Sequence, residues 1–294
     1  MTGRVAVLGA LHLDVVVDAP HLPRPGETLM GSAVAWRLGG KGANQAVAAA
    51  RMGAEAAMIG RVGRDASADQ LLGTLDAAGV ERGAVTRGDG ASGMSAAIVE
   101  AGGEYAAVVV SGVNATIAPA DAVLPDGTRV LLLQNEVPED ANIAAAGAAR
   151  AIGAEVILNA APARLLPEAL VESIDILVVN RIEAADMTGK ARPEAAARAL
   201  AARFREVIVT LGADGALHAT GGDVRTHPPH EVHALSSHGA GDFFLGALAA
   251  ERARKVPVAG ALAFAQAAAA LFVETAPEAR ATIDRAHVAR RFGL

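Results

Sequence analysis

The sequence predicts an α/β fold: a doubly wound, mostly parallel sheet with helices on both faces, together with a small β-sheet lid. Short runs of aliphatic and β-branched residues alternate along the chain with longer helical patterns, which is typical of a parallel sheet buried between helices. Hydrophobic residues make up 52% of the 294 residues, but aromatic residues only 3%. The core must therefore be built from alanine, valine, leucine and isoleucine.

The alternation predicts the order of the elements. Strands are expected over residues 5–8, 56–59, 130–133, 156–158, 176–179 and 207–210. Helices are expected over residues 43–52, 66–78, 139–151, 193–203, 242–253 and 258–273. Ligands of such a sheet bind beyond the carboxyl ends of the strands.

Two segments, residues 12–37 and 92–110, contain strand-like pieces but no helical pattern. The first includes the turn Pro23-Arg24-Pro25-Gly26, and the second reads as two short strands around Gly102-Gly103. Such strands can form a lid that excludes water from a site, or they can extend the edge of the main sheet. Because no repeat or linker divides the chain, we expect one domain over residues 1–294, with these segments as its lid.

Composition excludes several classes of function. The formal net charge is −6 and no basic run occurs, so no nucleic-acid partner is expected. Cysteine is absent, which removes thiolate chemistry and favours the cytoplasm. Residues 5–11 read as a first strand rather than a signal peptide. The apolar stretch 258–273 is too short to span a membrane, so no membrane partner is expected.

The segment Gly239-Ala240-Gly241-Asp242 lies at the start of an apolar helix. Small residues let backbone amides approach an anion closely, and a helix N-terminus adds partial positive charge. A carboxylate beside such an anion hole suits phosphoryl transfer to an alcohol, because it can orient or deprotonate the attacking hydroxyl. The alternative is an ordinary acidic residue in the first turn of a helix.

A second glycine-rich segment, Gly39-Gly40-Lys41-Gly42-Ala43-Asn44, opens the helix that follows it. Its glycines permit close backbone approach, and Asn44 can donate and accept hydrogen bonds to a polyol. It is neither a Walker A loop nor a dinucleotide fingerprint, since the required Gly and Ser/Thr spacing is missing. A tight strand-to-helix turn is the structural alternative.

Polar residues at other strand ends complete the candidate site. Asn180 and Glu183 share one face of a helix and could organise Mg²⁺ through water, although from these residues alone a capping box is the better interpretation. Residues 210–215 could border a nucleotide or form a hairpin turn. Asp14 and Glu136 follow predicted strands, where carboxylates often face a ligand.

Taken together and in order, these segments resemble the ribokinase branch of the PfkB family of carbohydrate kinases. Residues 39–53 are similar to the first signature of that branch, and residues 235–246 resemble the second. The segments 159–164, 180–183 and 210–215 fit between them, and the likeness covers residues 5–273. The resemblance implies a ribokinase-like fold, ATP and Mg²⁺ as cofactors, and a homodimer formed through the lid.

The resemblance also assigns roles to individual residues. Asp242 would be the catalytic base, and the amides of Gly239, Ala240 and Gly241 would form the anion hole. The residues implied in sugar binding are His12, Asp14, Gly40, Lys41, Asn44, Glu136 and Asp242. Those implied around ATP are Asn180, Thr210, Gly212, Gly215, Gly241 and Gln266. Asn180 and Glu183 would serve Mg²⁺ through water.

The chain departs from the family pattern at three places. His12 stands where the first sugar-binding signature usually has Asn, which favours a sugar other than ribose. Ser236 stands where ribokinases usually have the Asp that binds the activating monovalent cation, and the loop at residues 274–278 also differs. We therefore predict weak or absent activation by K⁺.

The leading hypothesis is an ATP-dependent kinase that phosphorylates a hydroxyl of ribose or a related small sugar. A nucleoside kinase for adenosine, inosine or pseudouridine is the alternative within the family, with His12 or Trp36 stacking on the base. A non-catalytic sugar- or nucleotide-binding homologue is a further alternative. A nicotinamide dehydrogenase is weaker still, because the first strand leads into Gly9-Ala10-Leu11-His12 without the necessary glycines.

Overall fold

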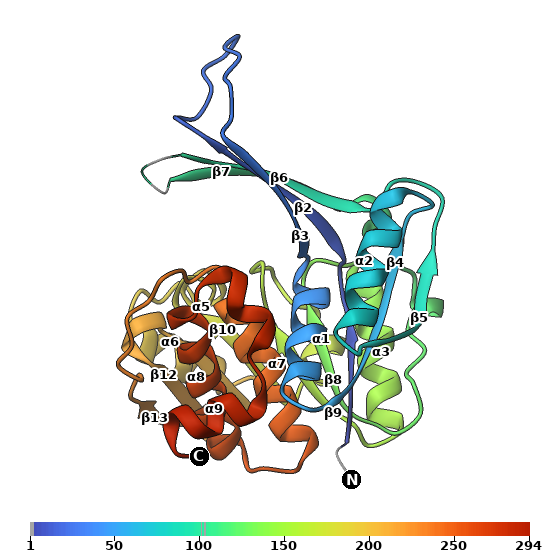
Figure 1. Cartoon of the computed structure of the whole chain (residues 1–294). Helices are drawn as coiled ribbons and strands as arrows, with labels where there is room; N and C mark the ends of the chain where they lie inside the picture. The colour runs from blue at the N-terminus through green and yellow to red at the C-terminus, as the bar shows by residue number, and fades with distance from the viewer. Residues whose placement is uncertain (1–2, 101, 103) are drawn as a thin grey trace.

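The computed structural model describes residues 3–100, 102 and 104–294 and contains two separate β-sheets (Figure 1). Across the nine-stranded sheet the order is β13 (Asp223–His227), β12 (Ala216–Thr220), β11 (Glu206–Thr210), β10 (Ile176–Asn180), β9 (Glu155–Asn159), β8 (Thr128–Gln134), β1 (Arg4–Leu8), β4 (Glu55–Val62) and β5 (Glu81–Arg87). Across the four-stranded sheet it is β3 (Ala33–Gly39), β2 (His12–Ala19), β6 (Gly93–Glu100) and β7 (Tyr105–Val110). The α/β class with an additional small sheet is confirmed.

The large sheet is parallel from β5 to β11 and antiparallel only at β12 and β13. All six predicted strands are present within it. The expected strands did not include β5, β12 and β13, of which β5 and β13 form the two edges of the sheet. Edge strands are half-solvated and carry polar residues, so they lack the aliphatic runs that identify the central strands.

Helices cover both faces of the large sheet. One layer consists of α1 (Lys41–Arg51), α2 (Ala66–Ala77), α7 (Ala240–Ala253), α8 (Val258–Glu274) and α9 (Arg285–Phe292). The other consists of α3 (Glu139–Ala151), α4 (Glu168–Val171), α5 (Arg181–Thr188) and α6 (Pro193–Leu200). Side chains of a strand alternate between the layers: Val5 and Val7 pack in the first core, and Ala6 and Leu8 in the second.

The helix predictions hold with small shifts at the ends. The predicted helix over residues 193–203 ends as α6 at Leu200, because residues 201–203 form a turn. Helix α8 matches the predicted buried helix. In the part of the chain that the structure describes, no helix has the length and apolar character needed to cross a bilayer.

Helices α1 and α7 approach each other unusually closely. A Cβ atom built on Gly246 would lie 2.4 Å from the Cβ of Ala48, so only glycine fits at this position. These two helices begin with the two glycine-rich segments, Gly40 being the N-cap of α1 and Gly239 that of α7. Their close packing places both N-termini at one end of the large sheet.

The four-stranded sheet projects beyond the carboxyl end of β1, while the start of β1 and the C-terminus lie at the opposite end of the molecule (Figure 1). Strand β2 pairs antiparallel with β3 and parallel with β6. It thus joins the two segments predicted to form the lid. The predicted turn around Gly102-Gly103 includes residue 103, which lies outside the described residues.

Candidate active site

The candidate site lies where the strand order of the large sheet reverses. From β1 the chain moves outward to β4 and β5, and then returns to β8 on the other side of β1. Loops that follow neighbouring strands diverge at such a point and leave room for a ligand. His12 and Asp14 lie at the start of β2, shortly after β1, and Glu136 lies in the loop after β8, so the carboxyl ends of both strands bring predicted residues here.

Asp242, in the first turn of α7, receives hydrogen bonds from two side chains of α1. Asn44 Nδ2 donates to Asp242 Oδ2 at 3.3 Å, and Gln45 Nε2 donates to Asp242 Oδ1 at 2.9 Å. Burial raises the pKa of Asp242, while Lys41, Gln45, Asn44 and His238 act against that rise. The carboxyl group is therefore held in a fixed direction with an increased affinity for a proton, as a general base requires.

A buried chain of amide side chains supports this arrangement. Gln134 Nε2 donates to Gln45 Oε1 at 2.7 Å, and Asn142 Nδ2 donates to the Gln134 carbonyl oxygen at 2.8 Å. Gln45 Nε2 also lies 3.1 Å from Asn159 Oδ1. The sequence analysis assigned no role to these residues. The one feature of the sequence that could have indicated them is Gln45, a polar residue among the small and apolar residues on the buried face of α1.

Glu136 and Lys41 meet at the start of α1. The backbone amide of Lys41 donates to Glu136 Oε2 at 2.7 Å. Burial raises the pKa of Glu136, partly offset by Lys41, and the nearby charges of Asp242 and Asp14 raise it further. Three predicted carboxylates thus share one neighbourhood with a single lysine.

Asp14 lies on β2 against the backbone of β3. Ser95 Oγ, from β6, donates to Asp14 Oδ1 at 2.6 Å. A Cβ atom on Gly39 would lie 2.2 Å from Asp14 Oδ2, so the carboxylate occupies space that only glycine leaves free. The role of Gly39 and the contact with Ser95 were not predicted, because the strand register that brings them together is not visible in the sequence.

His12 is 4% exposed, and its Nε2 is buried without a hydrogen-bond partner among the described residues. Burial lowers the pKa of His12, although Asp14 acts in the opposite direction. Neutral imidazole is therefore favoured. A buried, unpaired ring nitrogen is costly unless a ligand supplies its partner.

The residues predicted to form the anion hole, Gly239 to Gly241, make up the N-terminus of α7. Gly239 adopts a left-handed conformation with φ of 82°. The Ala240 amide donates to the Ser237 carbonyl oxygen at 3.1 Å, so it already has a partner. The amides of Gly241 and Asp242 make no hydrogen bond to any residue that the structure describes, as expected for the first turn of a helix. The Gly239 amide likewise makes no hydrogen bond to a described residue, so the amides of Gly239, Gly241 and Asp242 are open to an anion.

The residues predicted around ATP form a second group, beyond β10 and β11. Gly215 lies against the His227 carbonyl oxygen, which a Cβ atom at Gly215 would approach within 2.2 Å. Gln266, on α8, directs Nε2 to the carbonyl oxygens of His227 (3.4 Å) and Pro228 (3.3 Å). Thr210 ends β11, and Gly212 begins the turn that leads to β12. Gly215 and Gln266, which are distant in sequence, thus both border residues 227–228.

Asn180 and Glu183 form the capping box that the residues alone favoured. Asn180 Oδ1 accepts from the amides of Ile182 and Glu183, each at 2.8 Å, and Glu183 Oε2 accepts from the Asn180 amide at 2.8 Å. The hydrogen bonds among the described residues leave Glu183 Oε1 available. Burial raises the pKa of Glu183, and Lys41 and Asp242 act on it in opposite directions.

Within the same described residues, no group of three or more His, Asp or Glu side chains could hold a metal ion alone. A site with one or two carboxylates is nevertheless what Mg²⁺ uses when phosphate and water oxygens complete its coordination. Glu183 fits that pattern through its open oxygen.

Comparison with known proteins agrees with this geometry. The model of the pfkB family of carbohydrate kinases matches residues 2–281. The ribokinase of Bacillus subtilis is 34% identical over 274 residues, which cover 92% of each chain. A deoxyribokinase of Salmonella typhi is 33% identical over 258 residues, covering 83% of this chain and 84% of the relative.

Solved structures give the same result. The ribokinase of Thermotoga maritima superposes with a TM-score of 0.89 at 27% identity, covering 99% of this chain and 100% of that one. The ribokinase of Arabidopsis thaliana, solved with ribose and ATP, superposes with a TM-score of 0.89 at 28% identity, covering 99% of this chain and 98% of that one. The chain therefore belongs to the pfkB family of carbohydrate kinases, in its ribokinase branch, and is a phosphotransferase of that type.

Proposed function

We propose that this protein transfers the γ-phosphoryl group of ATP to a hydroxyl of ribose or a closely related small sugar. The observation that carries the proposal is the position of Asp242. Its carboxylate receives hydrogen bonds from Asn44 and Gln45 and lies in the turn that offers the open amides of the α7 N-terminus. A base and an anion site in one helical turn are what in-line phosphoryl transfer needs.

The sugar would bind between β2 of the small sheet and the N-terminus of α1. Asp14, Glu136 and Asn44 supply oxygens and an amide for hydroxyl groups, and glycines 39 and 40 allow the sugar to approach the backbone. Lys41 would balance the negative charge that the phosphoryl group brings. Closure of the small sheet over the sugar would exclude water from the reaction.

ATP would bind along β10 and β11, with its adenine side near Gly215 and Gln266 and its phosphates toward α7. Asn180 and Glu183 would hold the waters of Mg²⁺, which neutralises charge on the phosphates. The Arabidopsis thaliana ribokinase was solved with ribose and ATP, which supports the binding of a sugar and ATP by this chain.

The substrate is the point on which the relatives differ, since both ribokinases and a deoxyribokinase match at similar identity. His12 is the residue of this chain that bears on it, because its buried Nε2 needs a partner that a sugar hydroxyl can supply. Trp36 does not favour a nucleoside. It is paired with Val15 in β2, on the opposite face of the small sheet from Asp14.

The test is a substrate panel of ribose, deoxyribose, fructose, adenosine, inosine and pseudouridine with Mg·ATP, with the phosphorylated product identified by phosphorus NMR. We expect turnover with one of the free sugars. Turnover with nucleosides alone would replace the proposal with the nucleoside-kinase alternative. ATP binding without any product would support the non-catalytic homologue.

We also propose that two copies of the chain associate through the small sheet. The face opposite Asp14 carries Leu13, Val15 and Val17 of β2, and their partners on β3 and β6 are apolar as well. Several of its side chains are exposed: Val34, Trp36, Met94, Val108 and Val110. A contiguous apolar face of this kind is characteristic of an interface.

A further inference from the structure

Arg280 is a buried arginine whose guanidinium group is directed at backbone carbonyl groups. It lies in the short 3-10 segment η4 (Pro277–Thr282) and is only 8% exposed. Nη2 donates to the Ser236 carbonyl oxygen at 2.6 Å, Nη1 to that of His238 at 3.2 Å, and Nε to that of Thr275 at 3.1 Å. No carboxylate is paired with it among the described residues.

These three carbonyl groups belong to the two segments that frame the anion hole. Ser236 and His238 lie in residues 235–241, which we call the anion-hole loop and which includes the first two residues of α7. Thr275 caps the end of α8. The guanidinium also lies over the Phe272 ring, 4.2 Å from its centre, and that ring borders Gly239. One side chain therefore connects the end of α8 to the loop immediately before Gly241.

Carbonyl oxygens that converge on one point form a site for a positive charge, as they do when they bind K⁺. In this protein the charge that they meet is a guanidinium, which stays protonated at any pH that the protein tolerates. A monovalent cation does not fit the residues present. Ser236 offers no carboxylate there, and the carbonyls of Ser236, His238 and Thr275 are already engaged.

We propose that Arg280 is a positioning residue that serves as an internal cation, holding the anion-hole loop in its active shape and making turnover independent of added K⁺. This inference rests on the proposed function for its kinetic consequences. Arg280 touches no reacting atom. It acts through the loop, by fixing the carbonyl groups and thereby the direction of the amides of Gly241 and Asp242.

The experiment compares the wild type with Arg280→Ala, Arg280→Lys and the control Arg291→Ala. Arg291→Ala also removes a guanidinium that lies over a phenylalanine ring. Arg291, however, pairs with Glu274, and its hydrogen bonds among the described residues do not reach the anion-hole loop. Rates are measured in K⁺ and in tetramethylammonium, with and without methylguanidinium, and kcat is separated from the KM of the sugar.

We expect wild-type rates to agree within about twofold in the two salts. Arg280→Ala should lower kcat by about 10²-fold with little change in the sugar KM, as loss of an anion-hole contact does. Methylguanidinium should restore at least a tenth of the lost rate. Arg280→Lys keeps the charge but has fewer hydrogen-bond donors, so its kcat should lie between those of the wild type and Arg280→Ala. The kcat of Arg291→Ala should match that of the wild type.

Amide hydrogen exchange of residues 235–241 provides a readout that needs no turnover. Exchange should be faster in Arg280→Ala than in the wild type and should slow again with methylguanidinium. The proposal is overturned if wild-type turnover depends strongly on K⁺, if Arg280→Ala keeps full activity, or if loop exchange is unchanged. An inactive wild type would contradict the proposed function instead, and the exchange measurement would still decide the role of Arg280.

Discussion

At the scale of single residues, Asp242 shows how opposing effects set the properties of the site. Burial favours its protonated form, whereas Lys41 and the amide donors of Asn44 and Gln45 favour the carboxylate. The balance leaves its pKa above the ordinary value for aspartate. The residue is thus a better proton acceptor than an exposed aspartate, at some cost to the stability of the folded protein.

The sign of that cost is testable. A group whose pKa is higher in the folded than in the unfolded state contributes stability below its unfolded pKa, and this contribution is lost as pH rises through the folded pKa. Asp242→Asn cannot ionise, so its Tm relative to wild type should increase with pH above the ordinary range of an aspartate. Calorimetry across acidic and neutral pH measures the difference. A Tm difference that decreases with pH would contradict the assigned shift.

Gly39 tests the placement of Asp14. Gly39→Ala introduces a methyl group that would lie 2.2 Å from Asp14 Oδ2, so the carboxylate has to move away from the sugar. We expect the sugar KM to rise by about tenfold or more, as after loss of a hydrogen bond to a charged group, with a smaller effect on kcat. Steady-state kinetics is the measurement. Gly73→Ala, where nothing lies within 4 Å, is the control.

At the scale of secondary structure elements, the contact between α1 and α7 positions the site. Asn44 and Gln45 lie on the first helix and Asp242 on the second, so the hydrogen bonds of the Asp242 carboxylate depend on the distance between the helices. That distance depends on Gly246, which is packed against Ala48.

Gly246→Ala should therefore separate α1 from α7. We expect a loss of stability of about 1–3 kcal/mol, as for overpacking of a core, together with reduced kcat. Urea unfolding and initial rates measure the two effects. The matched control is Gly147→Ala in α3, where nothing lies within 4 Å and the change should stabilise the helix by about 1 kcal/mol. Equal behaviour of the two variants would contradict the role of the close contact.

The small sheet is the second element with a testable role. Trp36→Lys places a charge on the exposed apolar face, on the edge strand β3, where Trp36 is 55% exposed. If two copies pair through this face, the variant should be a monomer in light scattering at concentrations where the wild type is a dimer. Ile152→Lys, on the far end of α3 and 58% exposed, should leave the dimer intact. A wild type that is monomeric at high concentration would contradict the proposed interface.

At the scale of the whole molecule, the central strands could be predicted because both of their faces are buried and their aliphatic runs are uninterrupted. The glycine-rich segments could be predicted because their residue types reveal the chemistry of a helix N-terminus. The edge strands β5 and β13 could not, since they carry the composition of loops.

The supporting residues of the site were beyond the reach of local patterns for another reason. Gln45 meets Asn159, and Arg280 meets Ser236, across long separations in sequence. Neither contact produces a recognisable pattern in the neighbouring sequence. The alternative interpretation of Asn180 and Glu183, the capping box, was correct from spacing alone because that motif is local.

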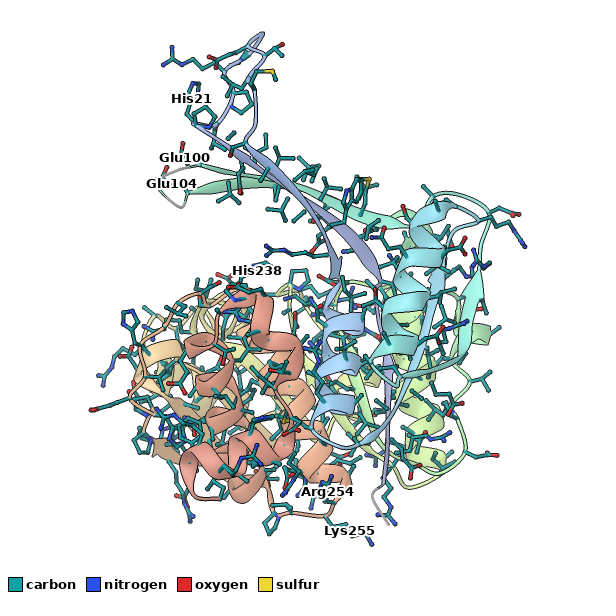
Figure 2. All side chains as sticks on the ribbon, in the orientation of Figure 1. His21, Glu100, Glu104, His238, Arg254 and Lys255 are labelled. Carbon is teal, nitrogen blue, oxygen red and sulfur yellow. The ribbon has the colours of Figure 1, made fainter. Side chains whose placement is uncertain are left out.

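The proposed base, the proposed anion hole and the small sheet proposed to bind the sugar lie at one end of the large sheet, the end near which Figure 2 labels His238. His238, just before α7, is labelled on the side that faces the small sheet, whereas Arg254 and Lys255, after α7, lie at the opposite end. Arg254 and Lys255 are thus distant from the candidate site, and the proposed reaction depends on the first turn of the helix.

The most direct measurement is sugar-dependent formation of ADP from Mg·ATP by the wild type and by Asp242→Asn, on the sugar that the panel identifies. We predict that the variant folds and binds ATP like the wild type, while kcat falls by about 10²–10⁴-fold, as after removal of a general base. Turnover by Asp242→Asn close to that of the wild type would contradict the assignment of Asp242 as the base.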